Sequence, residues 1–474
     1  MTATARPAHA TPRQRRILAS LCLTMLMPSL DTSIANAGLP VLAHALGAAF
    51  ANVQWVVLAY LLAITSLIVG AGRLGDLLGR RRLLVAGIAL FTAASLACGL
   101  AGSLEALVVA RALQGLGAAA MLALAVALVG ETIPKERTGR AMGLLGTMSA
   151  IGTTLGPSLG GVLMTAWGWR SIFLVNVPLG LLNLWLARRW LPAPPRDDVA
   201  PRPRFDLAGT AVLAITLAAY ALAMTARRPQ LLAVAGAGAA AFVAIEARAA
   251  APLVQLATLR DPRLAGSLVA STLVATVIMT TLVVGPFHLA RALGLPPATL
   301  GLVLSAGPMV SALTGAPAGR LVDRVGAPRV MLGGLGAMLA GAVALALVPA
   351  AAGVPGYLAA LLVMTLGYAS FQPANNTALM AGVDAGRRGV VSGLLNLSRH
   401  LGLITGASAM GAVFAAVAGD ATTAGAAAVA RGTHAAFGVA AGLLVVALGA
   451  ALRGRALAPS EPSGAAASPG LSSG

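Results

Sequence analysis

Charged residues are scarce in this chain: they make up 10% of its 474 residues, while 58% of the residues are hydrophobic. A soluble globular domain carries roughly 25% charged residues, so this composition excludes a water-soluble protein. The sequence has two cysteines, Cys22 and Cys98, both within apolar runs, which excludes a disulfide framework. It also has no glycine-rich phosphate loop, no metal-ligand cluster and no nucleophilic triad. We therefore expect neither an enzyme nor an ATP-driven pump, and no cofactor or metal.

The net charge of +19 is spread over short clusters between apolar runs and does not gather on one basic face. This distribution argues against nucleic-acid binding and is typical of the loops of a membrane protein. With the N-terminus inside, most arginines fall on one side, and the other side carries Arg170, Arg227, Arg228, Arg291 and Arg431. The positive-inside rule then predicts a multi-pass protein of the inner (plasma) membrane, with both termini cytoplasmic. We expect a monomer surrounded by the lipid bilayer.

Apolar runs of about 20 residues, the length that crosses a bilayer, predict fourteen transmembrane helices. The expected fold is an all-α membrane protein with two six-helix bundles and two inserted helices. In order, we expect a cytoplasmic arm (1–16), an N-terminal bundle (17–190), a cytoplasmic linker (191–206), the inserted helices (207–247), a C-terminal bundle (248–455) and a disordered tail (456–474). The first run, followed by Ala35-Asn36-Ala37, also resembles a cleaved signal peptide, but an even number of spans requires it.

A short polar turn occurs twice, and each copy closes one apolar run and opens the next. Residues 72–82 read GRLGDLLGRRR, and residues 319–329 read GRLVDRVGAPR. The matching positions are Gly72, Arg73, Leu74, Asp76, Gly79 and Arg82 in the first copy and Gly319, Arg320, Leu321, Asp323, Gly326 and Arg329 in the second. Such a repeat indicates an internally duplicated membrane protein. The copies are farther apart than the about 180–200 residues that six spans need, and the inserted helices account for the surplus.

Asp31 is the acidic residue that the predicted spans place firmly inside the membrane. A charge there is costly unless it is paired or hydrated, so Asp31 is a candidate functional residue. At about 1.5 Å per residue, Arg111 in the fourth span lies in the same outer half, within reach of the carboxylate. We interpret the two as a proton-coupling pair, with Gln114 one turn from Arg111 completing a polar lining. The alternative is that Arg111 turns outward to the membrane surface and Asp31 caps a broken helix.

The fifth predicted span carries a glycine stripe. Gly152, Gly156 and Gly160 recur every fourth residue and predict a smooth face for close helix packing. Pro157 frees the Thr153 carbonyl, so the helix should bend there. The stripe suits a seal or hinge, although helix packing alone would also explain it. The residues assigned to this helix are Gly143, Gly152, Gly156, Pro157, Gly160 and Gly161.

Polar residues in spans 12 and 13 predict either the lining of a cavity or a hydrogen-bond network between helices. Among them, His400 is a further candidate proton site, because imidazole changes its charge near neutral pH. Aromatic residues nearby would give an adaptable apolar pocket, although such residues more often face lipid. The candidates for the substrate cavity are Gln114, Phe287, Tyr368, Phe371, Asn375, Asn376, Asn396, Arg399 and His400.

These stretches resemble the major facilitator superfamily, and within it the fourteen-span drug:proton antiporters of the EmrB/QacA type. The 72–82 turn resembles the family's cytoplasmic signature, LDTSIANAGLP around Asp31 its first-span motif, and RALQGLGAA from Arg111 its fourth-span motif. The fifth-span glycines match the exporters' motif at every spacing, and residues 167–180 and 396–402 are also similar to this group. The resemblance implies the major facilitator fold, rocking around a central cavity. It also implies a cytoplasmic gate containing Gly72, Arg73, Asp76, Gly79, Arg80, Arg81, Gly319, Arg320, Asp323 and Arg324.

The function implied by this resemblance is proton-coupled efflux of lipophilic drugs or antibiotics, driven by the proton gradient. Asp31 would bind either the proton or the substrate. Because just one membrane carboxylate is placed firmly, we expect neutral or monocationic cargo. One alternative is a proton-coupled importer of a small nutrient or metabolite, against which the fifth-span stripe weighs. Another is a receptor or lipid-handling protein built on the same fold.

Overall fold

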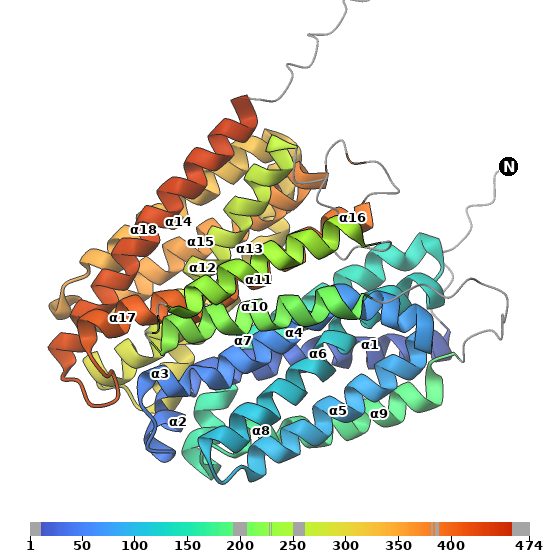
Figure 1. The fold of residues 1–474 in the computed structure, drawn as a ribbon, viewed down its shortest axis with the longest axis horizontal. Coiled ribbons are helices and arrows are strands. Elements are labelled where there is room, and N and C mark those ends of the chain that lie inside the picture. The colour runs from blue at the N-terminus through green and yellow to red at the C-terminus, as the bar shows by residue number, and fades with distance from the viewer. Residues whose placement is uncertain are drawn as a thin grey trace, which may run out of the picture.

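The structure is a computed structural model that describes residues 11–192, 206–226, 228, 230–249, 261–380, 383 and 388–456. These residues are almost entirely helical (Figure 1). Thirteen helices of the described part are long and apolar enough to cross a membrane. A further helix, α7 (Lys135–Trp167), is 33 residues long, and its glycine, serine and threonine residues reduce its hydropathy. The architecture is therefore the expected all-α membrane fold, with helices for about fourteen spans.

The helices fall into two halves joined by an inserted pair. The N-terminal half contains α1 (Pro12–Ala37), α2 (Leu39–Ala45), α3 (Phe50–Val53), α4 (Trp55–Leu78), α5 (Arg80–Leu100), α6 (Leu104–Thr132), α7, α8 (Ser171–Leu174) and α9 (Asn176–Trp190). The C-terminal half contains α12 (Pro262–Phe287), η2 (His288–Ala292), α13 (Pro297–Val325), α14 (Ala327–Leu347), η3 (Ala350–Ala352), α15 (Gly353–Met380), α16 (Arg388–Thr405), η5 (Gly406–Met410), α17 (Gly411–Ala418) and α18 (Ala426–Ala456). In each half the duplicated turn joins two consecutive long helices: α4 and α5 in the first half, and α13 and α14 in the second.

The N-terminal arm is shorter than the sequence predicts. The expected arm extends to residue 16, but α1 begins at Pro12. A capping box explains the difference: the Thr11 hydroxyl accepts the Gln14 N–H, and the Gln14 side chain accepts the Thr11 N–H. Residues 1–10, the linker from 193 to 205 and the tail from 457 lie outside the described residues. The division of the chain into domains stays a prediction.

The inserted helices α10 (Leu207–Thr225) and α11 (Gln230–Arg248) pack against each other. α10 also contacts α4 of the N-terminal half and η5 of the C-terminal half, so the pair lies along the junction of the two halves (Figure 1). The Trp55 indole donates a hydrogen bond of 3.2 Å to Thr225 at one end of this contact.

The duplicated turn has the same backbone conformation in both copies. Gly79 ends α4 and begins α5 with φ 89° and ψ 120°, and Gly326 ends α13 and begins α14 with φ 90° and ψ 143°. A positive φ of this size is open to glycine and strained for other residues, which explains why both copies keep glycine here. The repeat in the sequence is therefore also a repeat in the structure.

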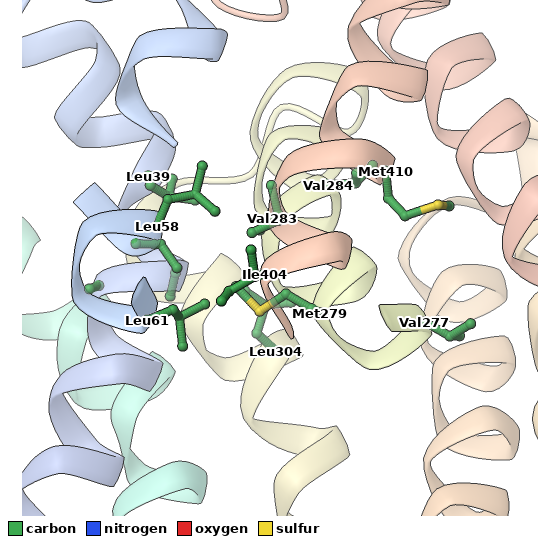
Figure 2. Packing of buried hydrophobic residues seen from close by; sticks show 14 of the residues in the cluster. Leu39, Leu58, Leu61, Val277, Met279, Val283, Val284, Leu304, Ile404 and Met410 are labelled. Carbon is green, nitrogen blue, oxygen red and sulfur yellow. The ribbon is translucent and has the colours of Figure 1, made fainter. Parts of the chain in front are cut away.

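The two halves share an apolar core near one end of the molecule. Figure 2 shows Leu58 and Leu61 of α4 close to Met279 and Val283 of α12, with Ile404 of α16 beside them. All five side chains are buried. We call this end the Phe50 end, because α3 lies there, and the opposite end the Asp76 end, because it holds the duplicated turns.

Candidate functional site

The centre of the N-terminal half holds a buried ion pair. The Arg111 Nη1 atom of α6 lies 2.5 Å from the Asp31 Oδ2 atom of α1. The exposed fraction is 1% for Asp31 and 0% for Arg111. The contact that the depths of the two residues predict is thus present, and Arg111 does not turn outward. A buried pair is stable when further hydrogen bonds satisfy its remaining atoms, so the surroundings decide what this pair can do.

Two amides complete the shell of the Asp31 carboxylate. Gln114 Nε2 and Asn176 Nδ2 each donate to Asp31 Oδ1 at 2.8 Å. Gln114 also accepts from Arg111 at 2.6 Å and donates to the Ser95 hydroxyl at 2.8 Å. Gln114 therefore belongs to the ion-pair network, and it does not border the small cavity described below, because its helix face turns toward α1 and α5.

The guanidinium of Arg111 is held from three sides. Its Nε atom donates to the Val56 carbonyl at 2.9 Å, and its Cζ atom lies 4.2 Å from the centre of the Tyr60 ring. Phe173 lies on a further side, with 5.7 Å from Cζ to the ring centre. Within the described chain, Arg111 Nη2 and Asn176 Oδ1 have no hydrogen-bond partner. A proton on Asp31 would remove the charge that pairs with Arg111, so the network can respond to protonation.

The helix that carries Asp31 is also tied to α7. Pro157 leaves the Thr153 carbonyl without its helical donor, as the sequence predicts. The Ser33 hydroxyl of α1 donates to this carbonyl at 2.8 Å. One turn along, the Ser29 and Ser149 hydroxyls are 2.7 Å apart. Asp31 thus lies between two polar contacts that join α1 to α7.

The glycine stripe of α7 explains how closely these helices approach. Gly152, Gly156 and Gly160 face α1, and a Cβ at Gly156 would lie 2.5 Å from the Ser33 Cβ. Gly161 instead faces the other half, where a Cβ would overlap the Pro297 carbonyl of α13. Gly143 differs from its predicted role, because no described atom lies within 4 Å of a Cβ there.

The contact between α7 and α13 is made by backbones. A Cβ at Gly301 of α13 would overlap the Pro157 carbonyl of α7. Next to it, the Ser158 backbone N–H donates to the Ser305 hydroxyl at 3.0 Å. α7 therefore joins the two halves directly.

A small cavity lies in the C-terminal half, between α12, α15 and α16. Its volume is about 10 Å³, which is room for about one water molecule. Of the predicted cavity residues, it brings together Tyr368, Phe371, Asn375, Asn376 and Arg399. Sequence reasoning missed the rest of its lining, which is Ser271, Val274, Ala275 and Gln372.

Besides Gln114, three predicted cavity residues lie elsewhere. Phe287 is buried at the Phe50 end, where its ring centre is 4.8 Å from that of Phe50. Asn396 and His400 do not border the cavity; the His400 Nδ1 atom lies 2.9 Å from the Asn396 carbonyl, one turn away on α16. The proton role of His400 stays a prediction.

The first copy of the duplicated turn is held by ion pairs within the N-terminal half. Arg80 binds Asp76 at 2.8 Å and Glu131 of α6 at 2.5 Å, and Arg81 donates to the Arg188 carbonyl at 2.6 Å. In the second copy, Asp323 forms no ion pair with any described residue. No Cβ contact arises at Gly72 or Gly319 within the described chain. The gate residues Arg73, Arg320 and Arg324 lie on the same two helix ends, and their gating role stays a prediction.

A family model described as Major Facilitator Superfamily matches residues 21–407 and 268–472, which include the ion pair, α7 and both turns. The chain belongs to the Major Facilitator Superfamily. Its relatives in this superfamily are transporters. Multidrug resistance protein Stp of Mycobacterium tuberculosis is 33% identical over 413 residues, which is 83% of this chain and 74% of that protein. Riboflavin transporter RibZ of Clostridioides difficile is 27% identical over 402 residues, 84% of this chain and 88% of that protein.

Solved structures agree with the major facilitator fold. A bacterial homologue of the human lysosomal transporter Spinster, in an inward-facing and occupied conformation, superposes with a TM-score of 0.71. The match covers 94% of this chain and 98% of that chain at 16% identity, which compares the folds and not the cargo. This member of the superfamily is thus a multi-pass membrane transporter, and its coupling ion and cargo are matters for proposal.

Sequence reasoning missed several partners of the site residues: Asn176 and Ser95 in the ion-pair network, and Glu131 at the first duplicated turn. Asn176 binds Asp31 from a position 145 residues away, and Glu131 binds Arg80 from 51 residues away. A polar amide within the apolar stretch around Asn176 was a visible signal, but a lone asparagine does not show which residue it will meet. Ser95 gave no signal, because serine is common in apolar helices, where its hydroxyl bonds to the preceding turn.

Proposed function

We propose that this transporter is a proton-coupled antiporter of the fourteen-span drug:proton type, which exports lipophilic neutral or monocationic compounds. The observation that supports this most directly is the ion pair of Asp31 and Arg111. A carboxylate that is 1% exposed, and held by one guanidinium and two amides, is the kind of group that a transporter uses to load and release a proton.

The contacts of α1 suggest how a proton on Asp31 reaches the rest of the molecule. The ionised carboxylate draws Arg111, Gln114 and Asn176 together between α1, α6 and α9. Protonation removes the charge and turns an acceptor oxygen into a donor, which weakens this junction. α1 is bonded to α7 through Ser33, and α7 meets α13 of the other half. Proton binding at Asp31 would thereby bias the packing of the two halves, which alternating access requires.

The cavity supports the proposed class of cargo. Tyr368 and Phe371 offer aromatic surface, Asn375 offers an amide, and the described lining contains Arg399 and no carboxylate. A cationic wall without a balancing carboxylate repels a dication about twice as strongly as a monocation and does not repel a neutral compound. At its present volume the cavity excludes drug-sized cargo, so we propose that cargo enters in another conformation. In this scheme the Phe50 end faces the exterior, the Asp76 end faces the cytoplasm, and the duplicated turns form the cytoplasmic gate.

Transport by purified protein in acidic-inside vesicles tests the proposal. We expect accumulation of tetraphenylphosphonium, a lipophilic monocation, that collapses with a protonophore, and no accumulation of the dication propidium. Asp31→Asn should abolish gradient-driven accumulation, while Asp31→Glu should retain it at a lower rate. The matched control is Glu105→Gln, which neutralises an exposed carboxylate at the start of α6.

Because Asp31 is the buried counter-ion of Arg111, Asp31→Asn will also reduce stability, so folding is verified by gel filtration and thermal unfolding. Normal gradient-driven transport by folded Asp31→Asn protein would overturn the proton role. Normal uptake of propidium would overturn the charge class of the cargo.

A second candidate function is proton-coupled transport of a vitamin-like nutrient. It is favoured by the similarity to a riboflavin transporter over 84% of this chain. The same vesicles distinguish the two functions. Riboflavin that drives proton movement, without any response to tetraphenylphosphonium, would select the nutrient transporter.

A further inference from the structure

Phe50 of the N-terminal half is inserted into the C-terminal half. Its ring centre lies 4.8 Å from that of Phe287 in α12 and 5.0 Å from that of Phe414 in α17, and both pairs are edge-to-face. Each of the three rings is at most 1% exposed. Edge-to-face pairs contribute beyond the area they bury, so this cluster favours the closed arrangement of the Phe50 end.

The backbone of the same residue is held by an acidic side chain of the other half. The Phe50 N–H donates to the Asp420 Oδ1 atom at 3.1 Å. Asp420 lies in the connection between α17 and α18, where it also accepts the Thr422 N–H at 3.0 Å and the Thr422 hydroxyl at 2.8 Å. One carboxylate therefore organises its own loop and binds the first residue of α3 across the junction of the halves.

The charge on Asp420 is favoured by its surroundings. Burial alone would raise its pKa, but hydrogen bonds from Thr422 and Phe50 and the nearby Arg291 charge hold the pKa below its ordinary value. A group with a lowered pKa contributes its stabilisation at neutral pH and loses it as the pH falls through the lowered value. Asp420 is thus ionised, and its contact with Phe50 is charge-assisted, under ordinary conditions.

A third contact closes the same end. Gly411 begins α17, and a Cβ there would overlap the Gln54 side-chain amide of the N-terminal half. Gln54 is 2% exposed, so it has little room to move aside. The absence of a side chain at Gly411 is therefore a condition for closure at the Phe50 end.

We propose that Asp420, Phe50 and Gly411 form a latch that holds the Phe50 end closed and so sets the balance between the two access states of the transporter. This inference rests on the proposed alternating access, but it concerns which residues hold one end shut and not which ion or cargo is carried. Asp420 acts as a positioning residue through its contact with the Phe50 backbone.

Distance measurements between spin labels test the latch on the whole protein, without cargo or gradient. Labels at Ala45→Cys in α2 and Ala427→Cys in α18 report the separation of the halves at this end; both positions are exposed. The buried cysteines are replaced by Cys22→Ala and Cys98→Ala. Loss of a hydrogen bond to a charged group changes an equilibrium about 10-fold or more, so Asp420→Ala should raise the ratio of long to short distances by about that factor.

Three further variants separate the latch from a purely local role of Asp420. Thr422→Val removes the hydroxyl bond within the loop but keeps the bond to Phe50, so it should leave the distances unchanged. Gly411→Ala should lengthen them by a different route, through the Gln54 amide. Asp420→Asn keeps the acceptor oxygen and should lie between the wild type and Asp420→Ala.

The latch is overturned if Asp420→Ala leaves the distances unchanged, or if Thr422→Val shifts them as much as Asp420→Ala does. If Asp420→Ala does not fold, Gly411→Ala decides by the same criterion. Because no transport is measured, a failed latch leaves the proposed antiport untouched. A failure of proton coupling would likewise leave a positive distance result standing.

Discussion

In the N-terminal half, α1 and α6 meet through Asp31, Arg111 and Gln114, and the space between them is filled with hydrogen bonds. In the C-terminal half, α12 and α15 hold the equivalent places around the duplicated turn, and between them lies the small cavity. α15 has no charged residue, and α12 has Arg263 near its start. The two halves thus use the same helix pair differently: one holds a buried charge pair, and the other leaves space.

This difference suggests a division of labour within a duplicated scaffold. A buried charge pair needs close partners on every side, whereas a binding site needs space and unsatisfied polar atoms. Asn375 meets the second need, because its side chain is 1% exposed and its Oδ1 atom has no partner among the described residues. We therefore expect equivalent substitutions in the two halves to have unequal effects.

The largest difference in unfolding free energy should be between variants of Arg111 and Arg399. Arg111→Gln leaves Asp31 as an unpaired buried charge and should lower the free energy of unfolding by about 3–5 kcal/mol. In the C-terminal half, Arg399→Gln on α16 changes an exposed side chain at the cavity wall and should stay within about 0.5 kcal/mol of the wild type. Thermal or denaturant unfolding in detergent measures both. The double change Asp31→Asn with Arg111→Gln should recover part of the lost unfolding free energy. Equal losses for Arg111→Gln and Arg399→Gln would contradict the proposed difference between the two halves.

A smaller difference in stability is expected between variants of Asn176 and Asn375. Asn176→Leu removes a hydrogen bond to an ionised carboxylate, which should reduce stability by about 1.5–3 kcal/mol. Asn375→Leu replaces an amide whose oxygen is already without a described partner, so it should cost less than about 1 kcal/mol. Instead, Asn375→Leu should change the KM for cargo while the response to a protonophore stays intact. A vesicle assay that finds altered coupling and an unchanged KM would contradict the division of labour.

The smallest difference in stability is expected between variants at the two copies of the duplicated turn. Glu131→Gln breaks an exposed pair with Arg80 in the first copy, and such pairs contribute about 0.2–1 kcal/mol. Asp323→Asn in the second copy alters a carboxylate that has no ion pair among the described residues. The free energy of unfolding of this variant should therefore not differ measurably from that of the wild type. The salt dependence of unfolding gives a check. Added salt should reduce the difference in unfolding free energy between Glu131→Gln and the wild type. A difference that persists at high salt would indicate that packing, and not the ion pair, is its cause.

Features set by local chemistry were predictable from the sequence. Pro157 alone predicts the freed Thr153 carbonyl, and the matching glycines at 79 and 326 predict equal turns. The position of Asp31 and Arg111 in the same outer half of the membrane predicts that they pair. The partners of these features were not predictable. Nothing local to Ser33 shows that it meets the Thr153 carbonyl 120 residues later.

The residues assigned to the substrate cavity do not all line one cavity, for a related reason. Depth in the membrane gives one coordinate of a residue, and the direction in which its helix face turns gives another. Gln114 has the depth of a cavity residue but faces α1, and Phe287 faces α3 at the Phe50 end. Gly152, Gly156 and Gly160 were predicted to form one smooth face, and all three face α1, whereas the direction of Gly161, which contacts α13 of the other half, was not predicted. Direction depends on tertiary packing, which a single sequence does not specify.

The backbone contact of α7 with α13 has a consequence for inhibition. Because Gly161 and Gly301 place no side chain between the two helices, the backbone contact at these glycines cannot loosen by a change of rotamer. It can open only if whole helices separate. A compound that bound between the separated helices would hold the two bundles at a fixed angle. A blocker of this kind would compete with neither cargo nor protons, so mutations that reshape the cargo site would not relieve it.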